Sequence, residues 1–189
     1  MMIITAVCAM SSNYVIGDNG KIPFDLPEDR RFFREYCRYK LLVVGYKTFL
    51  GLPSMPDTDI FVLTNSHSDD VLACSYYRDA KGNKYNSVRS GNFAYFVGVV
   101  NSIPRPLSEI VVGGGGEIFK TFLPYLTDAR LTYVGKEVDG DVKFPIAKFL
   151  ELHSIRISAE ISYYECGDKR WERIHWKVKN KDRKELVVN

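Results

Sequence analysis

The sequence predicts a single α/β domain over residues 1–189, with a mostly parallel central sheet, an antiparallel C-terminal hairpin and helices on both faces. Short runs of Val, Ile and Leu alternate with segments in which apolar residues recur at helical spacing. Two of these runs lead directly into glycines and then into a helix pattern. A chain of 189 residues, 46% of them hydrophobic, is long enough to close one sizeable core.

The first candidate strand and the first candidate helix flank a long loop. Residues 3–9 are almost continuously apolar or β-prone, as expected of a strand that is covered on both faces. A loop follows over 11–26, and Pro27 opens a helix that is predicted to run to about Tyr39. The apolar residues that give this segment its helical spacing are Phe32, Phe33, Tyr36 and Cys37.

The middle of the chain continues the alternation of strands and helices. A buried strand is predicted over 41–44, with a short helix starting near Tyr46 and a further strand over 59–64. Residues 66–108 are harder to assign, and 93–100 fits either a helix or a strand. We expect an insertion within 66–108.

The C-terminal part begins with a strand, a glycine turn and a helix. The strand is predicted over 109–112, and four glycines at 113–116 lead from it into an amphipathic helix. A further strand is predicted over 130–138. The chain then closes with the antiparallel hairpin, whose strands are expected over 156–164 and 173–178.

Charge and cysteine usage exclude several classes of function. The formal net charge is +3, and the late basic residues fit a solvated hairpin better than a nucleic-acid surface, because nucleic-acid-binding motifs are absent. These residues are Lys169, Arg170, Arg173, Lys177, Lys179, Lys181, Arg183 and Lys184. The four cysteines are far apart and lack neighbouring histidines, so we expect free thiols, no metal site and a cytoplasmic location. The apolar start is too short to span a membrane, and we expect a monomer without nucleic-acid or membrane partners.

Three loops of the predicted sheet are expected to converge. In open α/β sheets ligands bind beyond the carboxyl ends of the strands, which here precede the loops after 3–9, 41–44 and 109–112. The glycines at 113–116 would let the backbone approach a ligand, and the following helix offers N–H groups to a phosphate. Residues 45–48, Gly-Tyr-Lys-Thr, form a second turn of this kind. Both patterns also fit turns that serve packing alone, and no full dinucleotide fingerprint is present.

Asp29 is the carboxylate that most strongly suggests chemistry. It lies in the first turn of an otherwise aromatic helix, directly after a loop flanked by prolines. An acid that faces an apolar pocket is suited to deliver a proton or to recognise a protonatable heterocycle. The alternative is that Glu28 and Asp29 only stabilise the start of the helix through its dipole.

The loop and helix start also carry the most specific pattern in the chain. Residues 15–29 read Val-Ile-Gly-Asp-Asn-Gly-Lys-Ile-Pro-Phe-Asp-Leu-Pro-Glu-Asp, and this run resembles the corresponding segment of dihydrofolate reductases. The resemblance continues at matching spacing through 45–48, 114–119 and 131–145, and so covers roughly residues 3–178. It implies the dihydrofolate-reductase-like fold and an NADPH-dependent reduction of 7,8-dihydrofolate to tetrahydrofolate, by hydride transfer to C6 with protonation at N5.

The resemblance also implies roles for individual residues. Asp29, Thr132 and Ile22 would be catalytic, with Asp29 bonding the pterin and Thr132 assisting it. The substrate-binding residues would be Val7, Cys8, Ala9, Asp29, Phe33, Thr48, Gly113 and Thr132. The cofactor-binding residues would be Ala9, Ile16, Gly17, Gly20, Ile22, Gly45, Tyr46, Lys47, Thr48, Thr64, Asn65, Gly114, Gly115, Gly116, Glu117, Ile118 and Phe119. The loop over 17–24 would close over the site and exclude water.

Some positions depart from the family's pattern. Phe119 replaces a tyrosine, Glu117 stands where an arginine is frequent, and Gly113 replaces a branched apolar residue, which enlarges or loosens the pocket. Thr58 stands where the family has an arginine that clamps the substrate's glutamate carboxylate. Either another cation such as Lys40 takes over or the substrate lacks a glutamate tail. Thr58→Arg is expected to lower the KM for dihydrofolate if the missing clamp weakens binding, and no improvement would indicate a substitute cation or another substrate.

These departures leave alternatives beside dihydrofolate reduction. One is a related reductase that acts on a tail-less pterin or on a pyrimidine of the riboflavin pathway. Another is a non-catalytic module that binds folate or a nucleotide. The acid in an apolar pocket argues against that module, because an unused buried acid costs stability.

Overall fold

The computed structural model describes residues 2–65, 74–104, 107–153, 157–166, 169–178 and 184–186. Its larger sheet has nine strands in the order β10-β11-β8-β1-β7-β3-β4-β6-β5. Their bounds are β1 Ile3–Ser11, β3 Leu41–Gly45, β4 Met55–Leu63, β5 Cys74–Ser75, β6 Tyr85–Gly91, β7 Glu109–Val112, β8 Asp128–Val134, β10 Ile157–Cys166 and β11 Lys169–Val178. A two-stranded sheet pairs β2 (Val15–Gly17) with β9 (Val142–Lys143).

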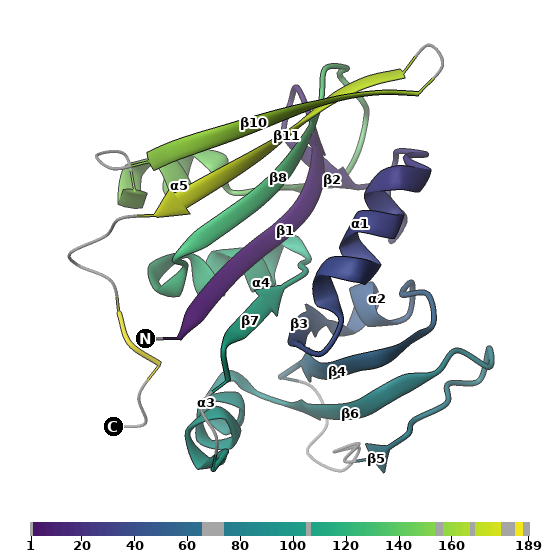
Figure 1. The fold of residues 1–189 in the computed structure, drawn as a ribbon, viewed down its shortest axis with the longest axis vertical. Coiled ribbons are helices and arrows are strands. Elements are labelled where there is room, and N and C mark those ends of the chain that lie inside the picture. Colours follow the sequence, from purple (N-terminus) through teal and green to yellow (C-terminus); the bar gives the residue numbers. More distant parts are fainter. Residues whose placement is uncertain are drawn as a thin grey trace.

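The strand directions confirm the predicted fold class. The pairs among β8, β1, β7, β3, β4 and β6 are all parallel, whereas β11 pairs antiparallel with β8 and with β10. Figure 1 shows this sheet as a twisted stack with the hairpin of β10 and β11 at one edge. At the opposite edge β5 adds a short antiparallel strand that the sequence did not predict.

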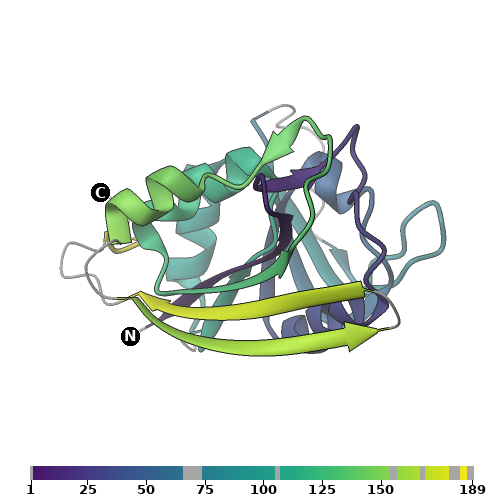
Figure 2. The ribbon, with the colours of Figure 1, turned by 90° about the horizontal axis from the view of Figure 1, so that it is seen from above.

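Helices cover both faces of the sheet. They are α1 (Pro27–Cys37), α2 (Tyr46–Phe49), α3 (Phe93–Ser102), α4 (Gly116–Phe122) and α5 (Ile146–His153), with a 3-10 turn at Leu123–Tyr125. Apolar residues of α1 and α2 pack in one core, and those of α3, α4 and α5 pack in the other. Figure 2 shows α4 and α5 together on one side of the sheet.

Successive side chains of a strand point to opposite faces of the sheet, which explains why two cores form. In β3, Val43 joins the core under α3, α4 and α5, whereas Leu42 and Val44 join the core under α1 and α2. All three are 0% exposed. A strand buried on both faces needs apolar residues at every position, and this need accounts for the continuous Val and Leu runs in the sequence.

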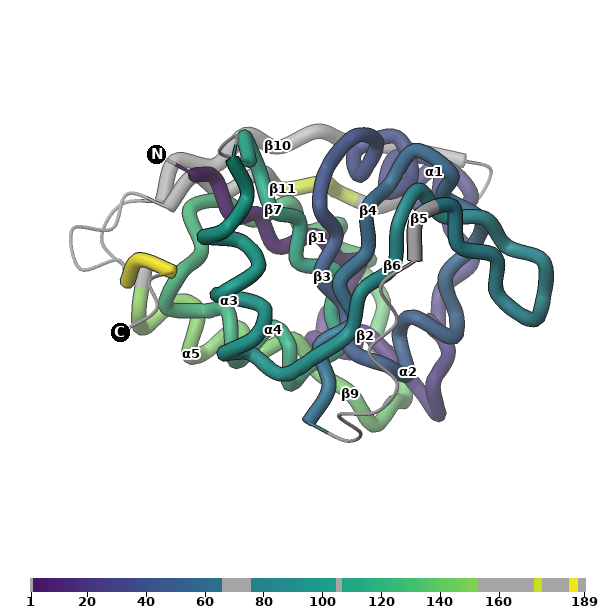
Figure 3. The backbone as a smooth tube through the Cα atoms, turned by 90° about the horizontal axis from the view of Figure 1, so that it is seen from below, coloured from purple at the N-terminus to yellow at the C-terminus, as the bar shows by residue number. Residues whose placement is uncertain are grey.

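Several predicted boundaries were wrong. The strand predicted over 59–64 begins at Met55, and the strand predicted over 130–138 spans β8, Asp128–Val134. Within 66–108, β6 and α3 form regular elements, so the segment 93–100 is helical. The segment between β5 and β6 projects from the edge of the sheet (Figures 1 and 3). No described helix is long and apolar enough to cross a membrane.

Candidate active site

Asp29 and Thr132 meet at the carboxyl end of β1. Thr132 lies on β8 in register with Ala9 of β1, and Asp29 lies in the first turn of α1, which begins at Pro27. The Thr132 hydroxyl donates a hydrogen bond to Asp29 Oδ1 at 2.5 Å. These two residues, far apart in the sequence, therefore form one polar unit at the end of the sheet.

A buried arginine completes this unit. Arg173 of β11 pairs in register with Thr132, and its Nη2 lies 3.0 Å from Asp29 Oδ1. Its Nε donates to the Thr132 hydroxyl oxygen at 3.4 Å. The guanidinium carbon lies 3.6 Å from the centroid of the Phe32 ring, and Arg173 is only 8% exposed. The prediction that Arg173 belongs to a solvated basic hairpin was therefore wrong.

Val7, Cys8 and Ala9 lie on β1 beside the segment of β8 that carries Thr132. Val7 is buried and Cys8 is half-buried, beside Ala9 at the same end of β1. Burial, with a smaller contribution from the negative charge of Asp29, raises the pKa of the Cys8 thiol far above its usual range. Cys8 is a free cysteine that remains a neutral thiol in this pocket. Cys37 is also free, whereas the side chains of Cys74 and Cys166 lie outside the described part of the chain.

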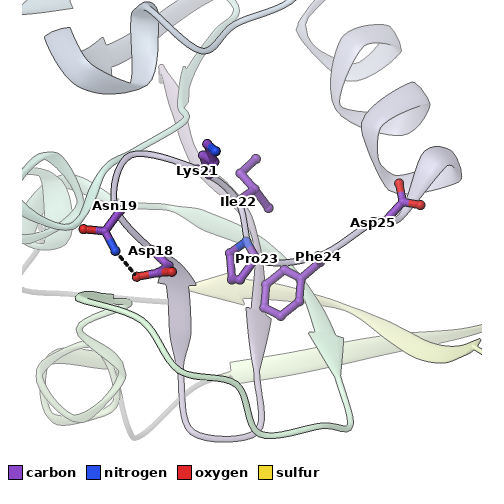
Figure 4. Close-up of a pocket in the computed structure, with 7 residues that line it drawn as sticks. All are labelled: Asp18, Asn19, Lys21, Ile22, Pro23, Phe24 and Asp25. Atoms are coloured by element: carbon purple, nitrogen blue, oxygen red, sulfur yellow. Dashed lines mark hydrogen bonds between the residues drawn. The ribbon is translucent and has the colours of Figure 1, made fainter.

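The loop after β2 forms an open hollow of about 580 Å³. Figure 4 shows the residues that line it: Asp18, Asn19, Lys21, Ile22, Pro23, Phe24 and Asp25. Ile22 is 66% exposed in this hollow. The loop itself runs from the end of β2 to the start of α1 (Figure 4). This is the loop that the sequence predicts to close over the site.

The loop after β2 and the turn before β2 are both hydrogen-bonded to the segment that precedes β9. The Asn19 N–H donates to Asp141 Oδ1 at 3.1 Å, and Asn13 Nδ2 donates to the Val138 carbonyl at 2.9 Å. Gly140 lies so close that a Cβ there would be 2.4 Å from Val15 Cγ1 and 2.5 Å from the Gly17 carbonyl oxygen. Tight backbone packing therefore sets the position of this loop.

Two glycine turns meet at the same edge of the sheet. The N–H of Gly45, the last residue of β3, donates to the carbonyl of Gly114, which follows β7, at 2.7 Å. The peptide bond between Gly114 and Gly115 is cis. A Cβ on Gly115 would lie 3.6 Å from Thr48 Oγ1, so the starts of α2 and α4 are neighbours. Neither helix has a side-chain cap, which leaves N–H groups available to an anionic ligand.

The other predicted cofactor residues lie around these turns. Tyr46 and Lys47 are exposed at the start of α2, and Thr64 and Asn65 directly follow β4. Gly116 adjoins β9, because a Cβ there would lie 3.1 Å from Val142 Cγ1. In α4, Ile118 and Phe119 are buried, whereas Glu117 is exposed and pairs with Lys120 at 2.7 Å. Ile16, Gly17 and Gly20 belong to the loop region around β2.

The residue at the position of the expected substrate-binding arginine is buried in the sheet. Thr58 lies within β4, is 1% exposed, and donates to the Cys37 carbonyl at 3.3 Å. Lys40, the suggested substitute, pairs with Glu109 Oε2 at 2.8 Å. The structure therefore does not support Lys40 as the replacement for the arginine.

Gly113 does not enlarge the pocket as one reading of the sequence suggested. A Cβ at Gly113 would lie 2.9 Å from Leu42 Cδ1, 3.1 Å from Val44 Cγ1 and 3.4 Å from Phe33 Cζ. Side chains of β3 and α1 have thus filled the space that a larger residue would occupy. Phe119, which lacks a hydroxyl, is 1% exposed and packs edge-on against Phe144 at 5.0 Å between ring centroids.

Comparison with known proteins identifies the family. The family model for dihydrofolate reductase matches residues 3–173. The chain belongs to the dihydrofolate reductase family. Dihydrofolate reductase from Enterococcus faecium is 30% identical over 173 residues, covering 88% of this chain and 94% of the relative. The enzyme from Haemophilus influenzae is 29% identical over 171 residues, covering 87% and 95% respectively.

A solved structure shares the fold. Dihydrofolate reductase from Enterococcus faecalis, complexed with NADP(H) and RAB-propyl, matches with a TM-score of 0.71 and 24% identity. The match covers 94% of this chain and 97% of that one. The predicted family and fold are therefore confirmed.

Proposed function

We propose that the unit of Asp29 and Thr132 binds and activates the pterin ring during reduction of 7,8-dihydrofolate. The chain is an oxidoreductase of the dihydrofolate reductase family, whose reaction is the NADPH-dependent reduction of dihydrofolate to tetrahydrofolate. The observation that carries the proposal is the hydrogen bond from Thr132 to Asp29, beside the apolar core that packs under α1. A non-catalytic module would have no use for an acid in that position.

Asp29 would act through its two oxygens in different ways. Oδ1 accepts from both Thr132 and Arg173, whereas Oδ2 has no hydrogen bond to any residue that the structure describes. Oδ2 would therefore accept from the amino group and ring N–H of a pterin, and the acid would support protonation at N5. The uncharged thiol of Cys8 and the buried side chain of Val7 would keep this end of the site apolar.

The residues at the two glycine turns fit a dinucleotide cofactor. A Cβ on Gly114 would lie 2.8 Å from the Phe119 ring, so this turn exists only because a side chain is absent. The bare backbone of Gly45, Gly114 and Gly115 would approach the pyrophosphate, with Lys47 and Thr48 beside it. NADPH supplies the hydride when bound. The protein would align the nicotinamide with the pterin and exclude water by closing the loop that contains Ile22.

One observation favours a second substrate class. The position expected to hold a carboxylate clamp carries the buried Thr58, and its neighbour Asp57 pairs with Arg38 at 3.0 Å. Asp59 accepts from Asn86 and Ser87. No cation replaces the clamp at positions 57 to 59. A pterin without a glutamate tail would therefore lose little binding energy at this part of the site.

The loss of NADPH absorbance distinguishes the two substrates. Dihydrofolate and a tail-less dihydropterin are compared as substrates, each with NADPH and with NADH. A kcat/KM for dihydrofolate at least tenfold above that for the tail-less compound would support dihydrofolate as the substrate. Equal values would favour the tail-less class, and no oxidation of NADPH with either compound would refute the proposal. Monomeric state and cytoplasmic location stay predictions from the sequence.

A further inference from the structure

We propose that Arg173 is a positioning residue that neutralises Asp29, and that it thereby directs the pocket toward electrically neutral aminoheterocycles and against those that bind as cations. The inference rests on the proposed function, in which Asp29 contacts the heterocycle. It goes further because it assigns the selection between neutral and cationic ligands to a residue of β11. Its basis is the ion pair of two nearly buried side chains, Arg173 at 9% and Asp29 at 16% side-chain exposure.

The ion pair is built into the fold. The register of β11 against β8 places Arg173 beside Thr132, and the Phe32 ring supports the guanidinium from the α1 side. Arg173 and Thr132 both donate to Asp29 Oδ1. The guanidinium contacts Asp29, Thr132 and the Phe32 ring, so it cannot move into water without breaking these contacts. The pair therefore persists as a unit with almost no net charge.

The charge of this unit determines which ligands it favours. A lone buried carboxylate strongly attracts a heterocycle that has gained a proton, because the two opposite charges meet in a medium of low dielectric constant. An arginine side chain carries a positive charge in proteins. Here that charge already balances the carboxylate of Asp29. A cationic ligand on Oδ2 would feel repulsion from Arg173 that offsets its attraction to Asp29. A neutral ligand, which only donates hydrogen bonds, is affected far less.

The test compares two tail-less probes that differ in basicity. 2,4-Diaminopteridine gains a ring proton readily, whereas 2-amino-4-oxopteridine remains neutral. Dissociation constants are measured by fluorescence titration near neutral pH, and the ultraviolet spectrum of the bound diamino compound reports its protonation. In Arg173→Met we expect the preference for the diamino probe over the oxo probe to rise at least tenfold, because the positive charge that is paired with Asp29 has been removed. The bound diamino probe should also become more fully protonated.

Two further variants distinguish the effect of the positive charge of Arg173 from a structural effect of its substitution. Arg173→Lys keeps the charge and should retain the wild-type preference, even if it loses the planar contact with Phe32. Arg38→Met removes an arginine that is 45% exposed at the other end of α1 and should leave the preference unchanged. If Arg173→Met fails to fold, Arg173→Gln provides the neutral comparison.

The outcomes distinguish the two proposals. If both probes bind and the preference is the same in wild type, Arg173→Met and Arg173→Gln, the role assigned to Arg173 is wrong while the proposed function stands. If neither probe binds the wild type or the variants, the assignment of the pterin site to Asp29 is itself wrong.

Discussion

Gly140 offers a direct test of how the loop beside the active site is held. In Gly140→Ala the new Cβ would lie 2.5 Å from the Gly17 carbonyl oxygen and 2.4 Å from Val15 Cγ1, whereas ordinary contacts begin at 3.4 Å. One of these atoms belongs to the backbone, so no side-chain rotation relieves the clash. The two segments must separate by about 1 Å, which costs about 1–3 kcal/mol of overpacking energy.

We expect Gly140→Ala to lower kcat more strongly than it lowers stability. Separation of these segments moves the loop that carries Ile22, and a misplacement of about 1 Å near reacting groups lowers kcat by roughly tenfold to a hundredfold. We expect a fall in Tm of roughly 5 °C, measured by calorimetry. The kcat is measured from NADPH oxidation at saturating substrate.

Gly135→Ala is the matched control. It lies in the turn after β8, and a Cβ there meets nothing within 4 Å. This variant should keep kcat and change stability by less than about 0.5 kcal/mol. If Gly140→Ala behaves like Gly135→Ala, close packing at Gly140 does not position the loop.

Two further predictions concern buried polar residues. Thr58→Arg should lower Tm by several degrees rather than lower the KM for dihydrofolate, because Thr58 is 1% exposed; an unchanged Tm with a lower KM would contradict this. Glu109 accepts from Lys40, Thr5 and Tyr36, and although burial raises its pKa, these partners outweigh burial and lower it below the usual range. Glu109 therefore stabilises the fold above its unfolded pKa of about 4.3 and loses this contribution as pH falls through its lowered folded value. Glu109→Gln should flatten the loss of stability in urea between pH 6 and pH 3, and an unchanged pH dependence would exclude this role.

The sequence allowed prediction of the parts that local pattern determines. Continuous apolar runs identified the buried strands, and Pro27, at the end of the loop before Asp29, identified the start of α1. The meeting of Asp29 with Thr132 followed from the resemblance of both segments to one family. These features depend on residues close together in the sequence or on a motif with fixed spacing.

Most of the features that were not predicted from the sequence depend on strand register. Arg173 resembles its basic neighbours in sequence, and only its pairing with Thr132 brings it to Asp29. A shift of one residue would turn it to the opposite face of the sheet. Likewise, the four extra residues at the start of β4 placed Thr58 inside a strand rather than in a loop. Strands as short as β2 and β9 leave almost no sequence signal.

The central claim is that Asp29 carries the chemistry, and Asp29→Asn tests it most directly. Because that variant removes the negative charge from the ion pair with Arg173, the double variant Asp29→Asn with Arg173→Gln serves as a neutral control for folding. NADPH oxidation with dihydrofolate is measured for the wild type and both variants, with NADPH affinity measured separately. We predict saturable oxidation by the wild type and a loss of at least about a hundredfold in kcat in both variants, with NADPH affinity unchanged. A kcat equal to that of the wild type in either folded variant would contradict the account.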